Sequence, residues 1–281
     1  MLVTLNEVLP AARKGHYAVG LFNTVNLEMA KGVLAAAEEL RSPVIIGTAE
    51  VLLPYASLEE LAYFLVPMAR KASVPVVLHF DHGLTAAKVH EAMDLGFSSV
   101  MYDCSTLDFD ANCRAVAELV REAHGRGVTV DAELGHVGAN EAGGESASAD
   151  ESIYTDPEDA RRFWEATGVD ALAVAIGTAH GAYKSAPKLD FRRLSEIAGL
   201  VKAPLVLHGG SGLSDGDFRQ AIANGIAKVN IFTDLNCAAA NAAHTDWADG
   251  KGLTDLMPGI TRAVKEAAMR KMEVFESCQK A

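Results

Sequence analysis

The sequence is poor in cysteine and contains no long apolar run. Its four cysteines, Cys104, Cys113, Cys237 and Cys278, show neither CxxC spacing nor a paired framework, which argues against a disulfide scaffold and favours a reducing compartment. No apolar run approaches the roughly 18 residues that a bilayer span needs. The N-terminus also lacks a basic stretch followed by an apolar block. We therefore expect a soluble cytoplasmic protein with no membrane partner.

Basic residues are scarce as well. The chain has 25 Lys and Arg against 37 Asp and Glu, a net charge of -12. Nucleic-acid binding needs clustered Lys and Arg, so a nucleic-acid partner is not expected. A small anionic substrate remains compatible with this charge, because a few local donors can outweigh it.

Short apolar runs alternate with longer amphipathic segments along the 281 residues. Eight runs have the Val, Ile, Leu and Ala content of strands buried on both faces, at residues 17–22, 43–47, 75–81, 98–103, 128–134, 171–177, 204–207 and 226–231. Helical patterns lie between them, for example at 27–40 and 112–124. Thr4 and Glu7 form a capping box, and Asp156-Pro157-Glu158 opens another helix.

Eight strand–helix units predict a single-domain parallel (β/α)8 TIM barrel over residues 1–281. A doubly wound open sheet is the alternative, but no GxGxxG motif follows the first strand. Residues 136–155 are rich in Gly, Ala, Ser and acid after the fifth strand. We expect them to form a mobile loop over the active end.

Histidines stand at the ends of three predicted strands, each beside a glycine: His82, His180 and His208. Catalytic groups of such barrels lie at the strand C-termini, so closure would direct these imidazoles to one volume. Three histidines with an open fourth position are typical of catalytic zinc. The alternative for each one alone is a hydrogen-bonded strand-end residue. His79 lies inside the third strand, and we interpret it as a core or supporting residue.

A glycine-rich turn, Gly209-Gly210-Ser211-Gly212, follows the seventh strand, and Asn230 and Thr233 lie at the end of the eighth. Barrel phosphate sites often use the loops after these two strands, although an ordinary tight turn has the same composition. Carboxylates complete the set at the strand ends and in the loop: Asp81, Asp103, Glu133 and Glu141.

Several of these motifs, in this order, resemble the class II fructose-bisphosphate aldolase family, and most closely its tagatose-bisphosphate branch. They are residues 79–83 (HFDHG), 175–184 (AIGTAHGAYK), 207–212 (LHGGSG) and 230–233 (NIFT), with Phe22-Asn23 and residues 131–135 (DAELG) in addition. The resemblance spans about residues 5–275. It implies a zinc-dependent cleavage of a ketose 1,6-bisphosphate to dihydroxyacetone phosphate and an aldehyde.

The resemblance also implies residue roles. His82, His180 and His208 match the zinc ligands, Asp81 the catalytic acid–base group and Glu141 the loop acid. Asp103 and Glu133 match acids that hold a second or displaced divalent metal or orient the first. Substrate contacts correspond to Asn23, Gly181, Lys184, Gly209, Gly210, Ser211, Asn230 and Thr233, and a Na⁺ or K⁺ site to Ala179, Gly181 and Ser211. A homodimer or homotetramer is implied, favoured also by the apolar segment 260–275, and some tagatose-type relatives use an accessory subunit.

Two departures concern the distal end of the substrate. Bisphosphate-binding members carry an Asp-Pro-Arg before the last helix, and Leu253 stands here where that Arg falls. Lys251 could replace the charge of that Arg but lacks its bidentate guanidinium group. Thr48 could donate one hydrogen bond to the distal end of the substrate. Phe232 is bulky where small or acidic residues are usual. A ketose 1-phosphate or another altered-tail substrate is therefore the alternative, and the sugar epimer stays open.

Two other kinds of protein share some of these features. A barrel zinc hydrolase also uses histidines and an acid, but it usually presents a His-x-His pair after the first strand, where this chain has Leu21-Phe22-Asn23. A non-catalytic sugar-phosphate-binding subunit is the second rival. Retention of the proton-transfer acids argues against it.

Overall fold

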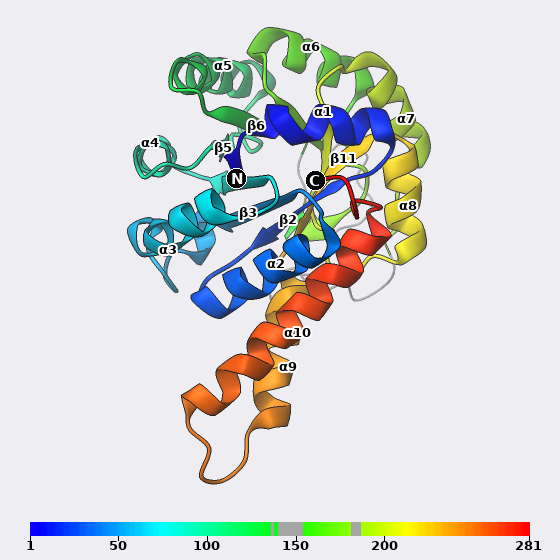
Figure 1. Ribbon diagram of the computed structural model, residues 1–281. Coiled ribbons are helices and arrows are strands. Elements are labelled where there is room, and N and C mark those ends of the chain that lie inside the picture. The colour runs from blue at the N-terminus through cyan, green and yellow to red at the C-terminus, as the bar shows by residue number, and fades with distance from the viewer. Residues whose placement is uncertain (136–137, 140–153, 181–186) are drawn as a thin grey trace.

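The computed structural model describes residues 1–135, 138–139, 154–180 and 187–281, without the side chains of 138, 139 and 180. Eight parallel strands close into a barrel (Figure 1), namely β2 (Val19–Asn23), β3 (Val44–Ala49), β4 (Val76–Gly83), β5 (Ser99–Tyr102), β6 (Thr129–Leu134), β8 (Ala171–Val174), β10 (Leu205–Leu207) and β11 (Ile226–Ile231). Closure is made where β11 pairs with β2, from Lys228 opposite Val19 to Ile231 opposite Phe22. The TIM barrel is confirmed, and the open doubly wound sheet is excluded.

The strands are rich in apolar residues, and they carry polar side chains at only a few inward-facing positions. Every residue of β2, β3, β6 and β11 is buried, as expected for strands lined by helices outside and by side chains inside. All eight expected strands are present. The sixth is shorter than expected and ends at Val174.

Helices cover the outside of the barrel (Figure 1). They are α2 (Leu27–Leu40), α3 (Leu58–Lys71), α4 (Ala86–Asp94), α5 (Phe109–Gly125), α6 (Pro157–Thr167), α7 (Phe191–Leu200), α8 (Asp215–Ala223), α9 (Thr233–Asp246) and α10 (Leu253–Val274), with a short 3-10 helix η1 (Glu50–Leu52). The predicted caps are present. The Asp156 side chain accepts hydrogen bonds from the backbone N–H groups of Glu158 and Asp159 at 2.9 and 3.1 Å, and the Glu7 side chain accepts one from the backbone N–H of Thr4 at 2.7 Å. Ser214 also caps α8.

Helix α1 (Leu5–Gly15) closes one mouth of the barrel. Its buried residues, including Leu5 and Leu9, form a cluster with inward-facing strand residues such as Leu21, Ile45 and Val77. The strand β1 (Leu2–Val3) pairs with the beginning of β4, so this is the N-terminal end of the strands. The C-terminal end is left for polar side chains.

Helices α9 and α10 project beyond the barrel as an arm (Figure 1). The C-terminal part of α10 packs against α2, where Gly32 allows close approach: a Cβ there would lie 2.8 Å from the carbonyl oxygen of Thr261. The buried side chains of α10, among them Val264 and Met272, lie in this packed part. Much of the apolar segment 260–275 is therefore buried within its own chain.

The predicted mobile loop at 136–155 falls mostly outside the described residues. Within it, β7 (Gly138–Ala139) pairs in parallel with β9 (Ala179–His180). Thr155 is buried, and its hydroxyl accepts a hydrogen bond from the backbone N–H of Ala175 at 2.8 Å. Across the described helices, none is both long and apolar enough to cross a membrane.

The contact between α2 and α10 predicts that Gly32→Ala lowers the free energy of unfolding by about 1–3 kcal/mol, because the added Cβ overpacks a helix crossing. The matched control is Gly199→Ala in α7, where a Cβ meets nothing within 4 Å. That substitution should be neutral or stabilising by up to about 1 kcal/mol. Urea unfolding measures both, and equal effects of the two would contradict the prediction.

Candidate functional site

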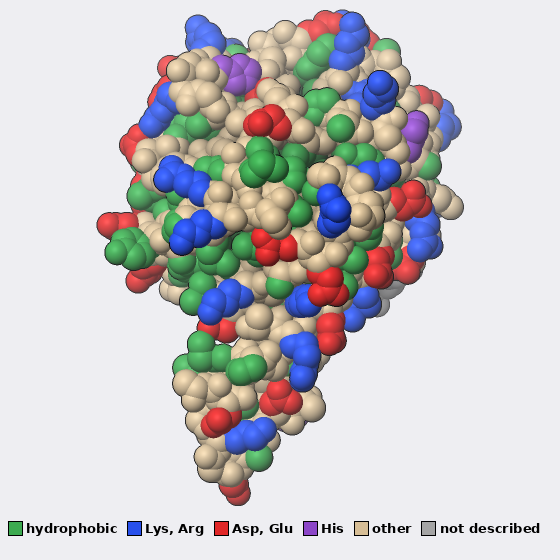
Figure 2. Space-filling view, in the orientation of Figure 1, with side chains coloured by type: hydrophobic (Ala, Val, Ile, Leu, Met, Phe, Trp, Pro, Cys, Tyr) green, Lys and Arg blue, Asp and Glu red, His purple; other side chains and the backbone are tan. Residues whose placement is uncertain are grey.

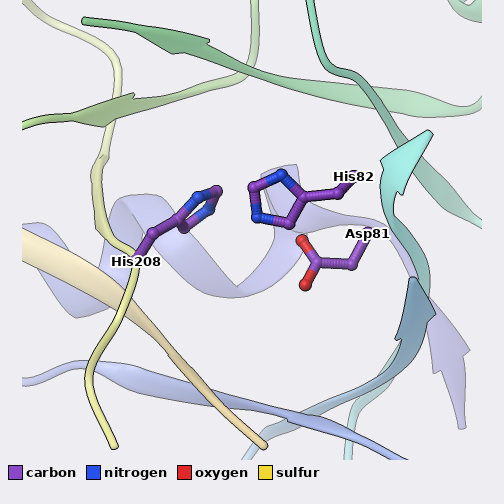
Figure 3. Close-up of side chains that lie close together, drawn as sticks. All are labelled: Asp81, His82 and His208. Atoms are coloured by element: carbon purple, nitrogen blue, oxygen red, sulfur yellow. The ribbon is translucent and has the colours of Figure 1, made fainter. Parts of the chain in front are cut away.

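An irregularity in β4 brings Asp81 and His82 to the same side. Neighbouring residues of a regular strand point to opposite faces. Here the pairing of β4 with β5 shifts register between Phe80 and Gly83, and His82 has a φ of 41°. Such bulges re-aim side chains, and a positive φ at a non-glycine residue is a strained conformation. Both side chains are thereby directed towards His208 (Figure 3).

The three side chains lie close enough to share a ligand. One potential ligand atom from each of Asp81, His82 and His208 lies within 4.8 Å of the others. The two imidazole rings meet edge to face, with centroids 4.5 Å apart. His208 and Asp81 are fully or almost fully buried. Two of the three predicted strand-end histidines are thus brought together beside the predicted catalytic Asp.

Each of these histidines is held by a carboxylate from another strand end. The Nδ1 atom of His82 lies 2.7 Å from Oδ2 of Asp103, which follows β5. The Nδ1 atom of His208 lies 2.7 Å from Oε2 of Glu133 on β6. A carboxylate at Nδ1 fixes the tautomer and orientation of the ring, which makes Nε2 the ring nitrogen that could bind a metal. Asp103 and Glu133 therefore have the geometry of orienting residues.

Two amides hold the carboxylate of Asp81. Asn23 on β2 donates through Nδ2 to Oδ2 at 2.8 Å, and Asn230 on β11 donates to Oδ1 at 3.0 Å. Among the described residues, neither Asn Oδ1 atom has a hydrogen-bond partner, and the buried Oγ1 of Thr48 has none either. These acceptor atoms face no protein donor in the described part of the chain, so they suit the hydroxyl groups of a ligand.

Burial and neighbouring charges shift the pKa values of Asp81 and His82 in opposite directions. Burial raises the pKa of Asp81, but His82, Lys228 and His208 outweigh it and hold that pKa well below its usual range. Burial lowers the pKa of His82, whereas Asp81 and the hydrogen bond to Asp103 raise it, to about 9. For His208, burial and then the nearby His82 lower the pKa to about 3. At neutral pH the metal-free site therefore has an ionised Asp81, a neutral His208 and a protonated His82.

A buried ion pair beneath the site was not anticipated from the sequence. Lys228 on β11 donates to Oδ2 of Asp131 on β6 at 2.7 Å, and both side chains are fully buried. Lys228 also acts on His79, whose pKa is lowered first by burial and then by Lys228. The alternation of side chains along a strand could have predicted this pair. Lys228 points to the same face of β11 as Asn230, and Asp131 points to the same face of β6 as Glu133, so both face the barrel interior. His79 is a buried supporting residue, with Nδ1 2.8 Å from the Ser99 hydroxyl.

The glycine-rich turn after β10 packs tightly against its neighbours. Gly209 has a φ of 65°, and a Cβ on it would lie 2.5 Å from the carbonyl oxygen of Ala179. The Ser211 hydroxyl accepts from the backbone N–H groups of Phe232 and Asp234, each at 3.4 Å. Helix α9 begins at Thr233, so the turn lies beside a helix N-terminus, where anions are stabilised.

Some predicted residues cannot be placed. Glu141, Gly181 and Lys184 lie outside the described residues, and of His180 only the backbone in β9 is described. We therefore still regard the loop acid, the third histidine and part of the cation and phosphate sites as predictions. Ala179, by contrast, is described and lies against Gly209.

The two departures at the distal end have different positions. Phe232 is the N-cap of α9 and packs against the core. Leu253 is 70% exposed and begins α10, beyond the far end of α9. The 14 residues of α9 span about 20 Å at 1.5 Å per residue. Leu253 and Lys251 are therefore displaced along the arm from the site of their own chain.

Comparison with known proteins identifies the family. The family model for class II fructose-bisphosphate aldolase matches residues 3–280. The Escherichia coli (strain K12) protein YdjI is 46% identical, with 96% of each chain covered, and a fructose-bisphosphate aldolase of Thermus caldophilus is 42% identical over the whole of both chains. The crystal structure of the YdjI aldolase has a TM-score of 0.88, at 40% identity over both whole chains. This chain therefore belongs to the class II fructose-bisphosphate aldolase family and is an aldolase, a lyase of carbon–carbon bonds.

Proposed function

We propose that this aldolase is zinc-dependent and reversibly cleaves a ketose 1,6-bisphosphate, of the tagatose or fructose type, to dihydroxyacetone phosphate and an aldehyde. The observation that carries the proposal is the cluster of His82 and His208 beside the buried Asp81. The fructose-bisphosphate aldolases among its relatives, from Thermus caldophilus and Staphylococcus epidermidis, support a phosphorylated sugar as substrate.

The donor set fits zinc. Imidazole nitrogen suits Zn²⁺, whereas Mg²⁺ and Ca²⁺ prefer sites made of oxygen atoms alone. His82 and His208 would bind through Nε2, with His180 as the third ligand, and Asp103 and Glu133 would hold the rings. A second divalent position fits the group of His82, Asp103 and Glu133, whose ligand atoms lie within 4.8 Å of one another. Bound zinc supplies a Lewis acid for the ketone oxygen.

Asp81 is the proposed base that accepts the C4 hydroxyl proton. Its two oxygens are fixed by Asn23 and Asn230, and nearby positive charge keeps it ionised. An oriented carboxylate of this kind contributes about 10²–10⁴-fold as a general base. Glu141 is the proposed acid that returns a proton to the carbon, as the family resemblance implies.

The phosphate of the dihydroxyacetone end is proposed to bind at the turn beside α9. Backbone N–H groups of Gly209, Gly210 and Ser211 and the N-terminus of α9 at Thr233 supply donors without a formal charge. Lys184 would add a positive charge, and a Na⁺ or K⁺ ion would lie near Ala179, Gly181 and Ser211. The Oδ1 atoms of Asn23 and Asn230 and the hydroxyl of Thr48 are available for substrate hydroxyls.

A ketose 1-phosphate or another altered-tail substrate is the second candidate. The observation that favours it is the position of Leu253 and Lys251 along the arm, away from the site of their own chain. We further propose a cytoplasmic location, which the four unpaired cysteines support.

The first test is release of dihydroxyacetone phosphate from fructose 1,6-bisphosphate, tagatose 1,6-bisphosphate and fructose 1-phosphate by the zinc-loaded protein. We expect cleavage of at least one bisphosphate, abolished by a zinc chelator. The Asp81→Ala variant should keep zinc and the thermal midpoint but lose about 10²–10⁴-fold in kcat, because the base is missing. Near-normal turnover by that variant would contradict the role of Asp81. Preference for fructose 1-phosphate would establish the altered tail.

The carboxylate partner of His208 predicts a specific effect on metal affinity. Glu133→Gln should weaken zinc binding by about 10–100-fold, because the ring loses its anionic orienting group. The control is Glu122→Gln, which alters an exposed His–Glu pair at 2.9 Å on the helices. Competition with a fluorescent chelator measures both affinities. Equal affinities of the two variants would argue against His208 as a ligand.

Zinc affinity should depend on pH through His82. A ligand imidazole must be neutral, and the pKa of His82 is raised to about 9 in the metal-free site. Below that pH, zinc displaces one proton, so the affinity should fall about tenfold for each unit of decreasing pH. His208, with a pKa of about 3, should release none. Isothermal titration in two buffers of different ionisation enthalpy counts the protons, and a value near zero at pH 7 would contradict the prediction.

A further inference from the structure

The backbone at His82 is strained, and its neighbours must hold it in place. His82 has a φ of 41°, a left-handed conformation that is uncommon for a residue with a side chain. Such a conformation costs free energy and persists only where the surrounding structure fixes it. It matters for the site because His82 and Asp81 are thereby turned to the same side of β4 (Figure 3). The contacts that hold residues 82–85 therefore also determine where these two side chains point.

The β5 side of this segment is held by Asp103. Its backbone N–H donates to the carbonyl oxygen of Gly83 at 2.9 Å, and its carboxylate lies 2.7 Å from Nδ1 of His82. Gly83 is also tightly enclosed, because a Cβ there would lie 2.5 Å from the Val89 side chain and 2.7 Å from the carbonyl oxygen of Met101. The chain up to Gly83 is thus fixed by its neighbours on β5 and α4.

The opposite side, towards β3, is held by a single carboxylate. Glu50 begins η1 and directly follows Ala49, the residue of β3 that pairs with Asp81. Its Oε2 atom accepts hydrogen bonds from the backbone N–H groups of Leu84 and Thr85 at 2.7 and 3.0 Å. Its Oε1 atom accepts a third from the Thr85 hydroxyl at 3.0 Å. Both carboxylate oxygens are therefore bound to the two residues that follow Gly83.

Charge alone does not distinguish Glu50 from other surface acids. Acidic and basic side chains are interspersed over the face of the molecule that Figure 2 shows. Glu7, on the helix that closes the other mouth of the barrel, makes similar contacts, accepting from the backbone N–H and the hydroxyl of Thr4 at 2.7 and 3.0 Å. The difference is the segment that each carboxylate holds. Glu7 holds the start of α1, whereas Glu50 holds the chain directly after the strained His82.

We propose that Glu50 is a positioning residue of the aldolase site, which holds the backbone after His82 and so keeps Asp81 and His82 directed towards His208. The inference rests on the function proposed for these three side chains. The effect comes from hydrogen bonding rather than from charge, because the partners of Glu50 are neutral N–H and O–H groups. Without them residues 82–85 can relax, and a displacement of about 1 Å at the reacting groups can cost about 10²-fold in rate.

The test uses three variants of the full chain that separate reach from charge. Glu50→Ala removes all three hydrogen bonds and should lower kcat for sugar cleavage at least about tenfold. Glu50→Gln is uncharged, but its Oε1 can accept from both N–H groups and its Nε2 can donate to the Thr85 hydroxyl, so it should retain most of kcat. Glu50→Asp keeps the charge but is one methylene shorter, so it should resemble the Ala variant. KM should change less than kcat, because the proposed phosphate turn lies beside α9 and not on β4.

Zinc affinity, measured by competition with a fluorescent chelator, is the readout that needs no sugar. Glu50→Ala should weaken zinc binding by at least about threefold, but by less than the roughly 10–100-fold expected for a direct carboxylate partner of a ligand. Glu50→Gln should restore it. The matched control is Glu7→Ala, which should lower the thermal midpoint but leave kcat and zinc affinity unchanged.

Wild-type kcat and zinc affinity in Glu50→Ala would overturn the proposal, and so would a Gln variant as impaired as the Ala variant. If Glu50→Ala does not fold, the Gln and Asp variants decide the question, since a functional Asp variant beside an impaired Gln variant would mean that charge matters and reach does not. If the wild type cleaves none of the three sugars, the proposed substrate class is wrong. The zinc affinities of the Glu50 variants then still test the positioning role.

Discussion

Three carboxylates buried inside the barrel must each be paired, and this constraint organises the site. An unpaired buried charge costs several kcal/mol. Asp81 is paired with the amides of Asn23 and Asn230, Asp131 with Lys228, and Glu133 with His208. Each pair joins residues from different strands, so each forms only when the barrel is closed. The closing strand pair, β11 with β2, supplies both Asn side chains that hold Asp81.

The barrel interior changes from apolar to polar along its axis. Helix α1 and apolar strand residues fill the N-terminal end. Lys228, Asp131 and His79 form a fully buried polar group within the strands, and the cluster of Asp81, His82 and His208 lies at the C-terminal ends. Because Lys228 lies in a medium of low dielectric, its charge acts strongly on Asp81 and His79 above it. The same burial keeps water away from Asp81. The pKa of Asp81 is therefore set by the charges of neighbouring side chains rather than by solvent.

The sequence predicted the parts of the molecule that depend on local pattern. The eight strands and helix α2 follow from periodicity, and the structure has each of them. His82 and His208 also lie together as expected, whereas His180 belongs to β9 rather than to the end of the sixth barrel strand, and its role stays a prediction. The β4 irregularity that turns Asp81 and His82 to one side could not be predicted, because it arises from register with β5. Nor could the roles of Asn23 and Asn230 as partners of Asp81, since they require contact across strands far apart in sequence. Glu141 and the 136–155 loop remain predictions.

The position of Leu253 also shows where motif comparison fails. By the family resemblance, this residue falls where an Arg for the distal phosphate is expected. The structure instead puts it at the exposed start of α10, separated from Thr233 by the length of α9. A residue there acts on a substrate only through whatever the arm contacts. The substitution is therefore evidence about the surroundings of the arm before it is evidence about the sugar.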